Sequence, residues 1–280
     1  MNNVATFSMD NAPSYEKVKI QVEGVTLEID TIYKKGKYPP FVFLHGFGSS
    51  KEEFNDFAYL PHLNEYGLLT YDTPGCGDTT CTDLSKVNIP FLVKTAKAIL
   101  NHYGISTFHL SGHSMGGLTA LLLASEMPDR VLSFINIKGN LAPEDCFLSR
   151  QVFLFPADDA ELFFHEFTER ARRAPAFSNA IYASNLRRKV SPHVTYGILS
   201  TMVEITDNND LLSMFLGLPC PKMFMYGVQN ASLSYLPKLK GEGVELAEIS
   251  CSGHFPMYSN PPEMFGRVTA FLENNRSIEG

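Results

Sequence analysis

The amino-acid sequence predicts an α/β fold: a mainly parallel eight-stranded sheet with an N-terminal antiparallel hairpin, flanking helices and a helical lid. Strand-like and helix-like runs alternate along most of the chain, which is typical of a parallel sheet with crossover helices. The alternation stops in residues 140–218, which read as several helices without a buried strand. At 280 residues the chain fits one large domain with a covering insertion. We therefore predict a core in two parts, residues 1–139 and 219–280, and a lid over residues 140–218.

The eight predicted strands begin with a hairpin. Two segments of alternating polar and apolar residues, KVKIQVEG and VTLEIDTIY, meet around Gly24. Six strand-like runs follow, and the first two are continuous apolar stretches of the kind found in buried parallel strands. In chain order these six are PFVFLHG (40–46), GLLTYDTPG (67–75), TFHLSGHS (107–114), RVLSFINIKG (130–139), PKMFMYG (221–227) and VELAEIS (244–250).

Helices are predicted between these strands. Residues 89–104 are amphipathic, with Pro90 near the start and Gly104 at the end, as helix termini prefer. Residues 115–128 follow the strand TFHLSGHS without a gap, so that strand is expected to run straight into a helix. The other predicted core helices are KEEFNDFAYL, SYLPKLK and PEMFGRVTAFLENN.

Composition limits the kinds of partner. Hydrophobic residues make up 44% and charged residues 19% of the chain, as in an ordinary soluble protein. The net charge of -7 and the pI of about 5.6 argue against a nucleic-acid groove or an anionic membrane surface as the main partner. No stretch reaches the ~20 apolar residues of a membrane span. The start, MNNVATFSMD, lacks the pattern of a signal peptide.

The five cysteines point to a reducing cytoplasm. They are odd in number and scattered, so they do not form a disulfide framework, and no pair has zinc-ligand spacing. We expect no metal and no organic cofactor, and a small ester-like molecule as the partner; a homodimer stays open.

The motif GHSMG at residues 112–116 carries the strongest chemical signal. It fits the G-x-S-x-G turn that exposes a serine oxygen at the top of a sheet, and it has the required strand before it and helix after it. Gly112 and Gly116 leave room for the tight turn. The helix that begins at Met115 places backbone N–H groups and a positive dipole end beside Ser114. We therefore predict Ser114 as a nucleophile.

Two further motifs complete the predicted machinery. HGFG (45–48) directly follows a buried strand, so the N–H groups of Phe47 and Met115 are predicted to form an oxyanion hole. SGHFPMYSNP (252–261) follows the last strand, and chain order makes His254 the base that takes the serine proton. We expect His45 to brace its loop. His113 packs inside the elbow and is placed, with Phe47, among the residues that contact substrate.

HGFG, YDTPGCGD, GHSMG and SGHFPMYSNP, in this order and spacing, resemble the lid-bearing α/β-hydrolases of the esterase, C–C hydrolase and haloperoxidase type. The resemblance covers nearly the whole chain except the lid. It implies a serine hydrolase that acts through an acyl-enzyme. Haloalkane dehalogenases and epoxide hydrolases carry Asp in the elbow, so Ser114 argues against both activities.

The acid that should orient His254 does not stand where the family has it. The G-x-x-D slot after the seventh strand reads GVQN, with Asn230 in place of the acid. The alternative slot, at the end of the sixth strand, holds Lys138, whose charge would oppose protonation of His254. Glu144 and Asp145 are the best nearby substitutes, although either could instead cap a lid helix. Asp207 and Asp210 lie farther along, at the end of the lid.

Three explanations stay open. The acid comes from an unexpected position, or a His–Asn pair suffices for an easy substrate, or the chain is an attenuated variant in which Lys138 replaced an acid. We favour the third, because the slot at residue 138 is otherwise well formed. Replacing a triad acid with an amide costs roughly 10⁴ in turnover, so the question matters for function.

The substrate predicted from the sequence is a small to medium apolar carboxylic ester. The alternatives are a C–C bond, a thioester or a lactone cleaved by the same machinery, or a ligand that is bound and not hydrolysed. The lid is rich in Phe, and these rings either form an apolar roof over Ser114 or pack the lid onto the core. They are Phe147, Phe153, Phe155, Phe163, Phe164, Phe167 and Phe177.

Overall fold

The computed structural model describes residues 12–276, with the exception of the side chain of Phe177. The segment MNNVATFSMD, on which the signal-peptide prediction rests, lies outside these residues. Within them the chain forms a nine-stranded sheet with the order β1-β2-β4-β3-β6-β7-β8-β9, and β5 pairs with β2. The strands are β1 (Ser14–Val22), β2 (Val25–Lys34), β3 (Tyr38–Leu44), β4 (Tyr66–Tyr71), β5 (Thr80–Cys81), β6 (Phe108–His113), β7 (Val131–Ile137), β8 (Lys222–Gly227) and β9 (Glu245–Ile249).

The pairing of the strands confirms the predicted fold class. β1 and β2 form the antiparallel hairpin, and β2 also pairs antiparallel with β4. The ladder from β4 through β3, β6, β7 and β8 to β9 is parallel throughout. The ninth strand, which the sequence did not predict, is β5. It pairs only two residues with β2, too few to leave a pattern in the sequence.

The helices of the core are α1 (Ile89–His102), α2 (Met115–Glu126), α7 (Leu236–Gly241), α8 (Pro256–Ser259) and α9 (Pro261–Asn275), with the 3₁₀ helices η2 (Lys51–Ala58), η3 (Leu84–Lys86), η4 (Pro128–Arg130) and η8 (Val228–Asn230). The predicted helix KEEFNDFAYL is therefore a 3₁₀ helix. Local sequence determines both ends of α1. At its N-terminus Asn88 accepts a hydrogen bond from Phe91 N, and beyond its C-terminus Gly104 takes a φ of 63°.

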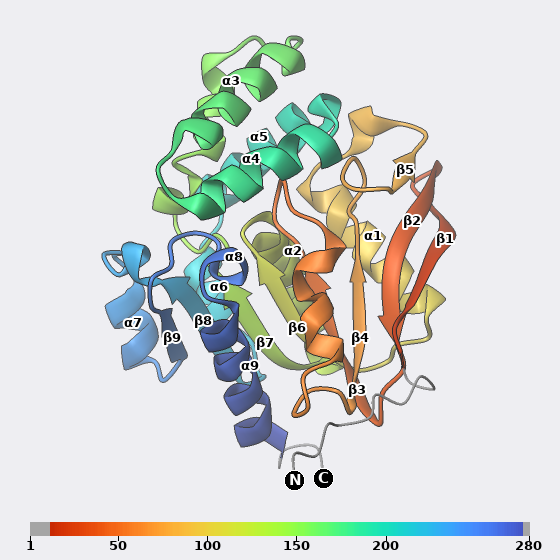
Figure 1. Cartoon of the computed structure of the whole chain (residues 1–280), viewed down its shortest axis with the longest axis vertical. Coiled ribbons are helices and arrows are strands. Elements are labelled where there is room, and N and C mark those ends of the chain that lie inside the picture. The colour runs from red at the N-terminus through yellow and green to blue at the C-terminus, as the bar shows by residue number, and fades with distance from the viewer. Residues whose placement is uncertain (1–11, 277–280) are drawn as a thin grey trace, which may run out of the picture.

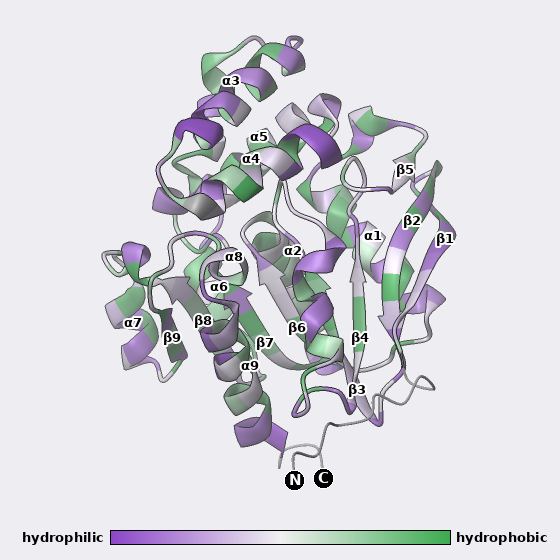
Figure 2. Cartoon of the chain, in the orientation of Figure 1, coloured by the Kyte–Doolittle hydropathy of each residue, from purple (hydrophilic) through white to green (hydrophobic). Residues whose placement is uncertain are grey.

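The helices cover both faces of the sheet. In Figure 1, α9 and η2 lie in front of the sheet, whereas α1 and α2 lie behind it. Phe54 of η2 packs edge-on against Phe265 of α9, with ring centroids 5.4 Å apart. Figure 2 shows hydrophobic residues along the strands and polar residues on the outer surfaces of the helices, as expected for a layered core.

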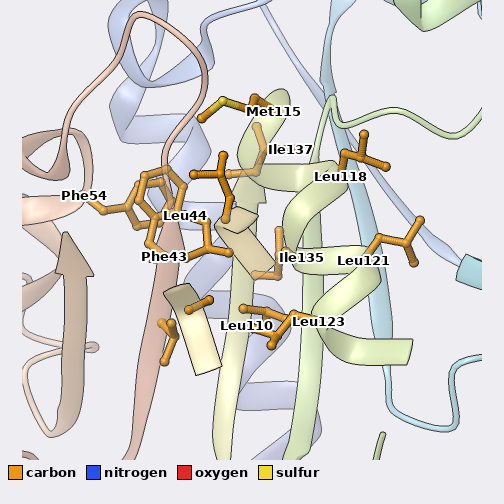
Figure 3. Close-up of a cluster of buried hydrophobic side chains, with 14 of the residues drawn as sticks. Phe43, Leu44, Phe54, Leu110, Met115, Leu118, Leu121, Leu123, Ile135 and Ile137 are labelled. Carbon is orange, nitrogen blue, oxygen red and sulfur yellow. The ribbon is translucent and has the colours of Figure 1, made fainter. Parts of the chain in front are cut away.

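A cluster of buried hydrophobic side chains lies beneath the start of α2. Side chains of β3, β6, β7 and α2 pack together there, with Met115 at the upper end (Figure 3). Met115, Leu118 and Ile137 are fully buried. This packing fixes the junction between β6 and α2 from below, so that its upper side can carry a functional group.

The regular elements between β7 and β8 are all helices, apart from an isolated bridge between Val190 and Cys76. They are η5 (Pro143–Cys146), η6 (Ser149–Leu154), α3 (Ala160–Arg173), α4 (Phe177–Lys189), η7 (Pro192–Val194), α5 (Thr195–Asn208) and α6 (Leu211–Gly217). α3, α4 and α5 stack above the edge of the sheet at which the parallel strands end (Figure 1). We refer to residues 140–218 as the helical insertion. No helix of the described residues is long and apolar enough to cross a membrane.

Two glycines provide a test of the packing. A Cβ on Gly116 would lie 2.0 Å from the carbonyl oxygen of Leu44, whereas a Cβ on Gly266 in α9 would meet nothing within 4 Å. We expect Gly116→Ala to lower the free energy of unfolding by about 3 kcal/mol, because backbone must move to admit the methyl group. Gly266→Ala, the matched control, should raise it by about 1 kcal/mol, since alanine favours the helix.

Urea denaturation of both variants measures the two effects. Equal stability of the Gly116→Ala protein and the wild type would contradict the close approach of α2 to β3.

Candidate active site

Ser114 stands at the junction where β6 ends and α2 begins. Its φ of 52° and ψ of -116° are strained for a residue with a side chain. Ser114 N donates to the carbonyl oxygen of Ile137 at 3.0 Å, which ties the turn to β7. A serine in such a conformation at a strand–helix junction points its oxygen away from the sheet. The sequence motif and the strained backbone therefore fall on the same residue.

The turn depends on the two glycines that flank it. A Cβ on Gly112 would lie 2.2 Å from the carbonyl oxygen of Gly116, and a Cβ on Gly116 would lie 2.0 Å from that of Leu44. A side chain at either position would force the first turn of α2 away from β3 or from β6.

Ser114 opens into a cavity of about 510 Å³ beneath the helical insertion. His254, Phe47, Lys138 and Asn230 line the same cavity. Further aromatic rings on its wall come from the insertion and from the residue after His254. These rings are Phe147, Phe167, Tyr182 and Phe255.

His254 follows β9 in the segment that leads into α8. Burial lowers the pKa of His254 well below its usual value, and the nearby His113 and Lys138 lower it further. The imidazole is therefore neutral at ordinary pH. Among the described residues, no hydrogen bond joins it to Ser114, although both side chains reach the cavity.

His113 braces the site from below. Its Nε2 lies 2.8 Å from the carbonyl oxygen of His254, and a Cβ on Gly46 would meet its Nδ1 at 2.7 Å. The side chain is buried and does not line the cavity, unlike the substrate contact that the sequence predicted for it. Its place between two loops suits a role in holding them.

The loop that carries Phe47 is held by His45. The Nε2 atom of His45 accepts a hydrogen bond from Thr73 N at 3.0 Å, so its Nδ1 carries the proton and donates to the carbonyl oxygen of Gly46 at 2.8 Å. Phe47 is buried between Gly46 and Gly48 and packs against Phe167 of α3. Met115 is the first residue of α2, where an N–H has no intrahelical acceptor.

Lys138 follows β7 directly and takes a φ of 49°. Its ammonium forms an ion pair with Asp145, and both side chains are almost fully buried. Asp145 accepts three more hydrogen bonds, from Leu141 N at 2.9 Å, from Ala142 N at 3.0 Å and from the hydroxyl of Tyr235 at 3.0 Å. Lys138, in the position where the family has an acid, is therefore neutralised by Asp145, which is itself held by three further hydrogen bonds.

The other candidate acids are also engaged away from His254. Glu144 accepts hydrogen bonds from the N and Oγ atoms of Ser234. Asp207 accepts hydrogen bonds from the two terminal guanidinium nitrogens of Arg150, and Asp210 caps α6. Asn230 lines the cavity with His254, but no hydrogen bond joins the two in the described part of the chain.

One acidic group within residues 12–276 has the spacing of metal ligands. Asp30, Asp72 and Asp78 lie close together, but the ammonium of Lys51 stands among them, 3.2 Å from Asp30 and 2.9 Å from Asp72. A lysine already supplies the positive charge that a metal ion would bring.

Sequence reasoning missed two groups that depend on distant parts of the chain. The first is the partnership of Lys138, Asp145 and Tyr235. The second is Tyr182 of α4, whose ring lies 4.6 Å from that of Phe255 and packs on Gly48. Lys138 and Asp145 are only 7 positions apart, but Tyr235 lies 90 positions from Asp145. Tyr182 is likewise far in sequence from Gly48 and Phe255, so no local motif could reveal these contacts.

The phenylalanines of the helical insertion differ in their surroundings. Phe163 and Phe164 are buried in packing, whereas Phe147 and Phe167 line the cavity. The side chain of Phe177 lies outside the described structure.

Comparisons with known proteins place the chain in a family. A family model described as the alpha/beta hydrolase fold matches residues 39–261. A pimeloyl-[acyl-carrier protein] methyl ester esterase of Aeromonas salmonicida is 30% identical over 86% of this chain and 98% of its own length.

Solved structures agree on the fold. A thermophilic esterase from Thermogutta terrifontis has a TM-score of 0.73 at 20% identity, covering 93% of this chain and 99% of that one. A structure from work on carboxylesterases of Nitrososphaera gargenis has a TM-score of 0.74 at 17% identity, covering 93% and 99%. The chain belongs to the alpha/beta hydrolase fold family.

Proposed function

We propose that this chain is a carboxylic ester hydrolase with Ser114 as nucleophile and His254 as general base. The observation that carries the proposal is the strained Ser114 at the strand–helix junction, which shares one cavity with His254 and Phe47. Membership of the alpha/beta hydrolase fold family supports a hydrolase. The esterase names of its relatives support an ester as substrate.

The proposed reaction runs in two halves. Ser114 Oγ attacks the ester carbonyl while His254 takes its proton, and the N–H groups of Phe47 and Met115 stabilise the oxyanion. The intermediate collapses to an acyl-enzyme, and the alcohol leaves with the proton from His254. Water then attacks the acyl-enzyme, again giving its proton to His254, and the acid is released as Ser114 regains a proton.

The substrate proposed is a small to medium apolar ester. Aromatic rings form much of the cavity wall, and burial of apolar groups against them would supply binding free energy. The neutral state of His254 suits a base, whereas Lys138 disfavours the imidazolium that forms during the reaction. We therefore infer slower turnover than a complete triad would give. The five free cysteines support a reducing compartment, and we propose the cytoplasm.

A second candidate is a member that binds a ligand without hydrolysing it. It is favoured by one observation: the groups that shift the pKa of His254 include no carboxylate. A fluorophosphonate probe separates the two. Rapid labelling of Ser114 requires an activated nucleophile, and its absence would favour binding alone.

Ser114→Ala should abolish ester hydrolysis. Loss of the nucleophile is expected to lower kcat by about 10⁴-fold or more, because only the oxyanion hole and binding would remain. The measurement is turnover of a panel of p-nitrophenyl esters of rising chain length, with folding checked by circular dichroism. Unchanged hydrolysis by the variant would refute Ser114 as the nucleophile. No turnover of any ester by the wild type would point to a different bond.

Activity should persist on the acid side of neutrality. His254 must be neutral to accept a proton, and its lowered pKa keeps it neutral as the pH falls. We expect kcat/KM to be retained at about pH 5.5, one unit below the usual histidine pKa of about 6.5. A pH profile that loses activity with a midpoint near 6.5 would show that His254 titrates normally.

The two acid slots should respond differently to a carboxylate. Lys138→Glu places a second buried carboxylate against Asp145, so we expect a loss of about 3 kcal/mol in the free energy of unfolding. Asn230→Asp puts the charge on the cavity wall instead. It should raise kcat by tenfold or more, within the roughly 10⁴-fold that a triad acid contributes. The new carboxylate should also raise the pKa of His254, so that activity on the acid side is lost at a higher pH.

Unfolding curves and pH profiles of both variants are the measurements. The double variant Lys138→Glu/Asp145→Asn is the control, because it removes the like-charge contact. A large gain in kcat for that double variant, with none for Asn230→Asp, would place the acid slot at residue 138.

A further inference from the structure

A partly buried group of polar residues joins three parts of the molecule that surround the proposed site. We call it the Glu53 cluster: Ser49, Glu53, Asn185 and Tyr258. Ser49 and Glu53 follow the Phe47 loop, and Asn185 lies on α4 of the helical insertion. Tyr258 lies on α8, four residues after His254. None of the four lines the cavity that holds Ser114, so the proposed chemistry does not use them.

Hydrogen bonds run through the cluster from the insertion to the core. Asn185 Nδ2 donates to the hydroxyl of Tyr258 at 3.1 Å. That hydroxyl donates in turn to Glu53 Oε1. Ser49 N donates to the carbonyl oxygen of Gly46 at 3.1 Å, which ties the cluster to the Phe47 loop. The chain of contacts thus links α4, the segment that bears His254 and the oxyanion loop.

The far oxygen of Glu53 has an unusual environment. Glu53 Oε2 and Ser49 Oγ are both buried, and neither has a hydrogen bond of standard geometry within the described residues. Ser49 nevertheless lies close enough to lower the pKa of Glu53. A protonated Oε2 could donate to Ser49 Oγ, whereas an ionised one would be a poorly solvated charge.

We propose that Glu53 is a positioning residue whose protonated carboxyl holds α4 and the His254 segment against the oxyanion loop, and whose ionisation loosens this roof over the substrate. The effect on substrate rests on the proposed esterase function, whereas the titration of Glu53 does not.

The contacts of α4 explain why ionisation of Glu53 should change the wall of the cavity. Tyr182 and Leu186 of α4 pack on Gly48, and Lys189 reaches Ser50 at 3.1 Å and Glu52 at 3.0 Å. Tyr182 also lines the cavity. A change in the seating of α4 on residues 48–53 therefore moves part of the cavity wall.

The charges around Glu53 set the direction of the switch. Burial raises the pKa of Glu53 to about 7, against opposing contacts with Ser49 and Tyr258. Glu52, the neighbour on η2, raises it further, and Lys189 of α4 lowers it. Tyr182 and Tyr258 face the same carboxyl, and their own pKa values are raised, so both stay neutral.

The nearby histidines do not titrate in the same window. Burial lowers the pKa of His45 and His254, and that of His113 to about 4. A transition near pH 7 that is present in the wild type and absent from Glu53→Gln would therefore belong to Glu53. Since the closed arrangement favours the neutral carboxyl, it is stabilised at low pH and weakened as the pH rises through about 7.

The kinetic experiment compares the wild type with Glu53→Gln on a p-nitrophenyl ester from about pH 6 to pH 9. Gln keeps the size of Glu, accepts from Tyr258 and can donate to Ser49, so it mimics the neutral acid. We expect the KM of the wild type to rise about fivefold or more across this range, as for a modest coupling between sites. The KM of Glu53→Gln should stay flat at the low-pH value of the wild type.

Glu52→Gln is the matched control on the neighbouring residue. Removing this negative charge should leave the rise in KM but move its midpoint to lower pH, because Glu52 raises the pKa of Glu53. A flat KM in the wild type, or the same rise in Glu53→Gln, would overturn the proposal.

A stability measurement tests Glu53 without any hydrolysis. The pKa of Glu53 is higher in the folded than in the unfolded protein, so its ionisation lowers the stability of the wild type between about pH 4.5 and pH 7, a contribution that Glu53→Gln lacks. The Tm of Glu53→Gln relative to the wild type should therefore rise over this range. A difference in Tm that does not change with pH would overturn the titration, whatever the esterase assay gives. Absence of Ser114-dependent hydrolysis would instead count against the proposed function alone.

Tyr258→Phe gives a second route if Glu53→Gln folds poorly. Losing the Tyr258 hydroxyl should raise the pKa of Glu53 and move the transition in Tm to higher pH. Because the hydroxyl also links Glu53 to Asn185 of α4, the KM of this variant should no longer rise with pH. A Tm transition that keeps its place, or an unchanged rise in KM, would contradict the proposal.

Discussion

The approach of α2 to the end of β3 is the constraint on which the site depends. The backbone at Gly116 passes so close to the carbonyl oxygens of Leu44 and His45 that no side chain fits there. This contact brings the first turn of α2 beside the loop that carries Phe47, and Ser114, the residue that precedes this turn, has a strained conformation. The packed layer beneath, from β3, β6, β7 and α2, holds the strain in place.

Local sequence was sufficient to predict this part of the molecule. The elbow, the glycine-flanked loop and the parallel strands each depend on residues within a few positions of one another, so spacing alone revealed them. The fold class was predicted on that basis and the family from the resemblance of its motifs, and both are confirmed. The roles assigned to Ser114, His254, Phe47 and Met115 stay predictions.

The rest could not be read from the sequence, because it depends on contacts between distant segments. Lys138 looked like a lost acid when only its strand was considered. In the fold it has a counter-ion in Asp145, which Tyr235 and two backbone N–H groups hold in place. Tyr258 stands near His254 in sequence, yet its partner Glu53 lies 205 positions away. No periodicity or spacing encodes such pairs.

The counter-ion changes the physical meaning of a cation in the acid slot. A lysine that had merely replaced an acid would leave an uncompensated buried charge, at a cost of several kcal/mol. Asp145 removes that cost, and its four donors would satisfy the carboxylate well. The ion pair carries no net charge, but its positive member, Lys138, lowers the pKa of His254. This arrangement keeps His254 neutral. As the proposed base, His254 would accept a proton less readily than in a complete triad, but it would stay uncharged over a wider range of pH.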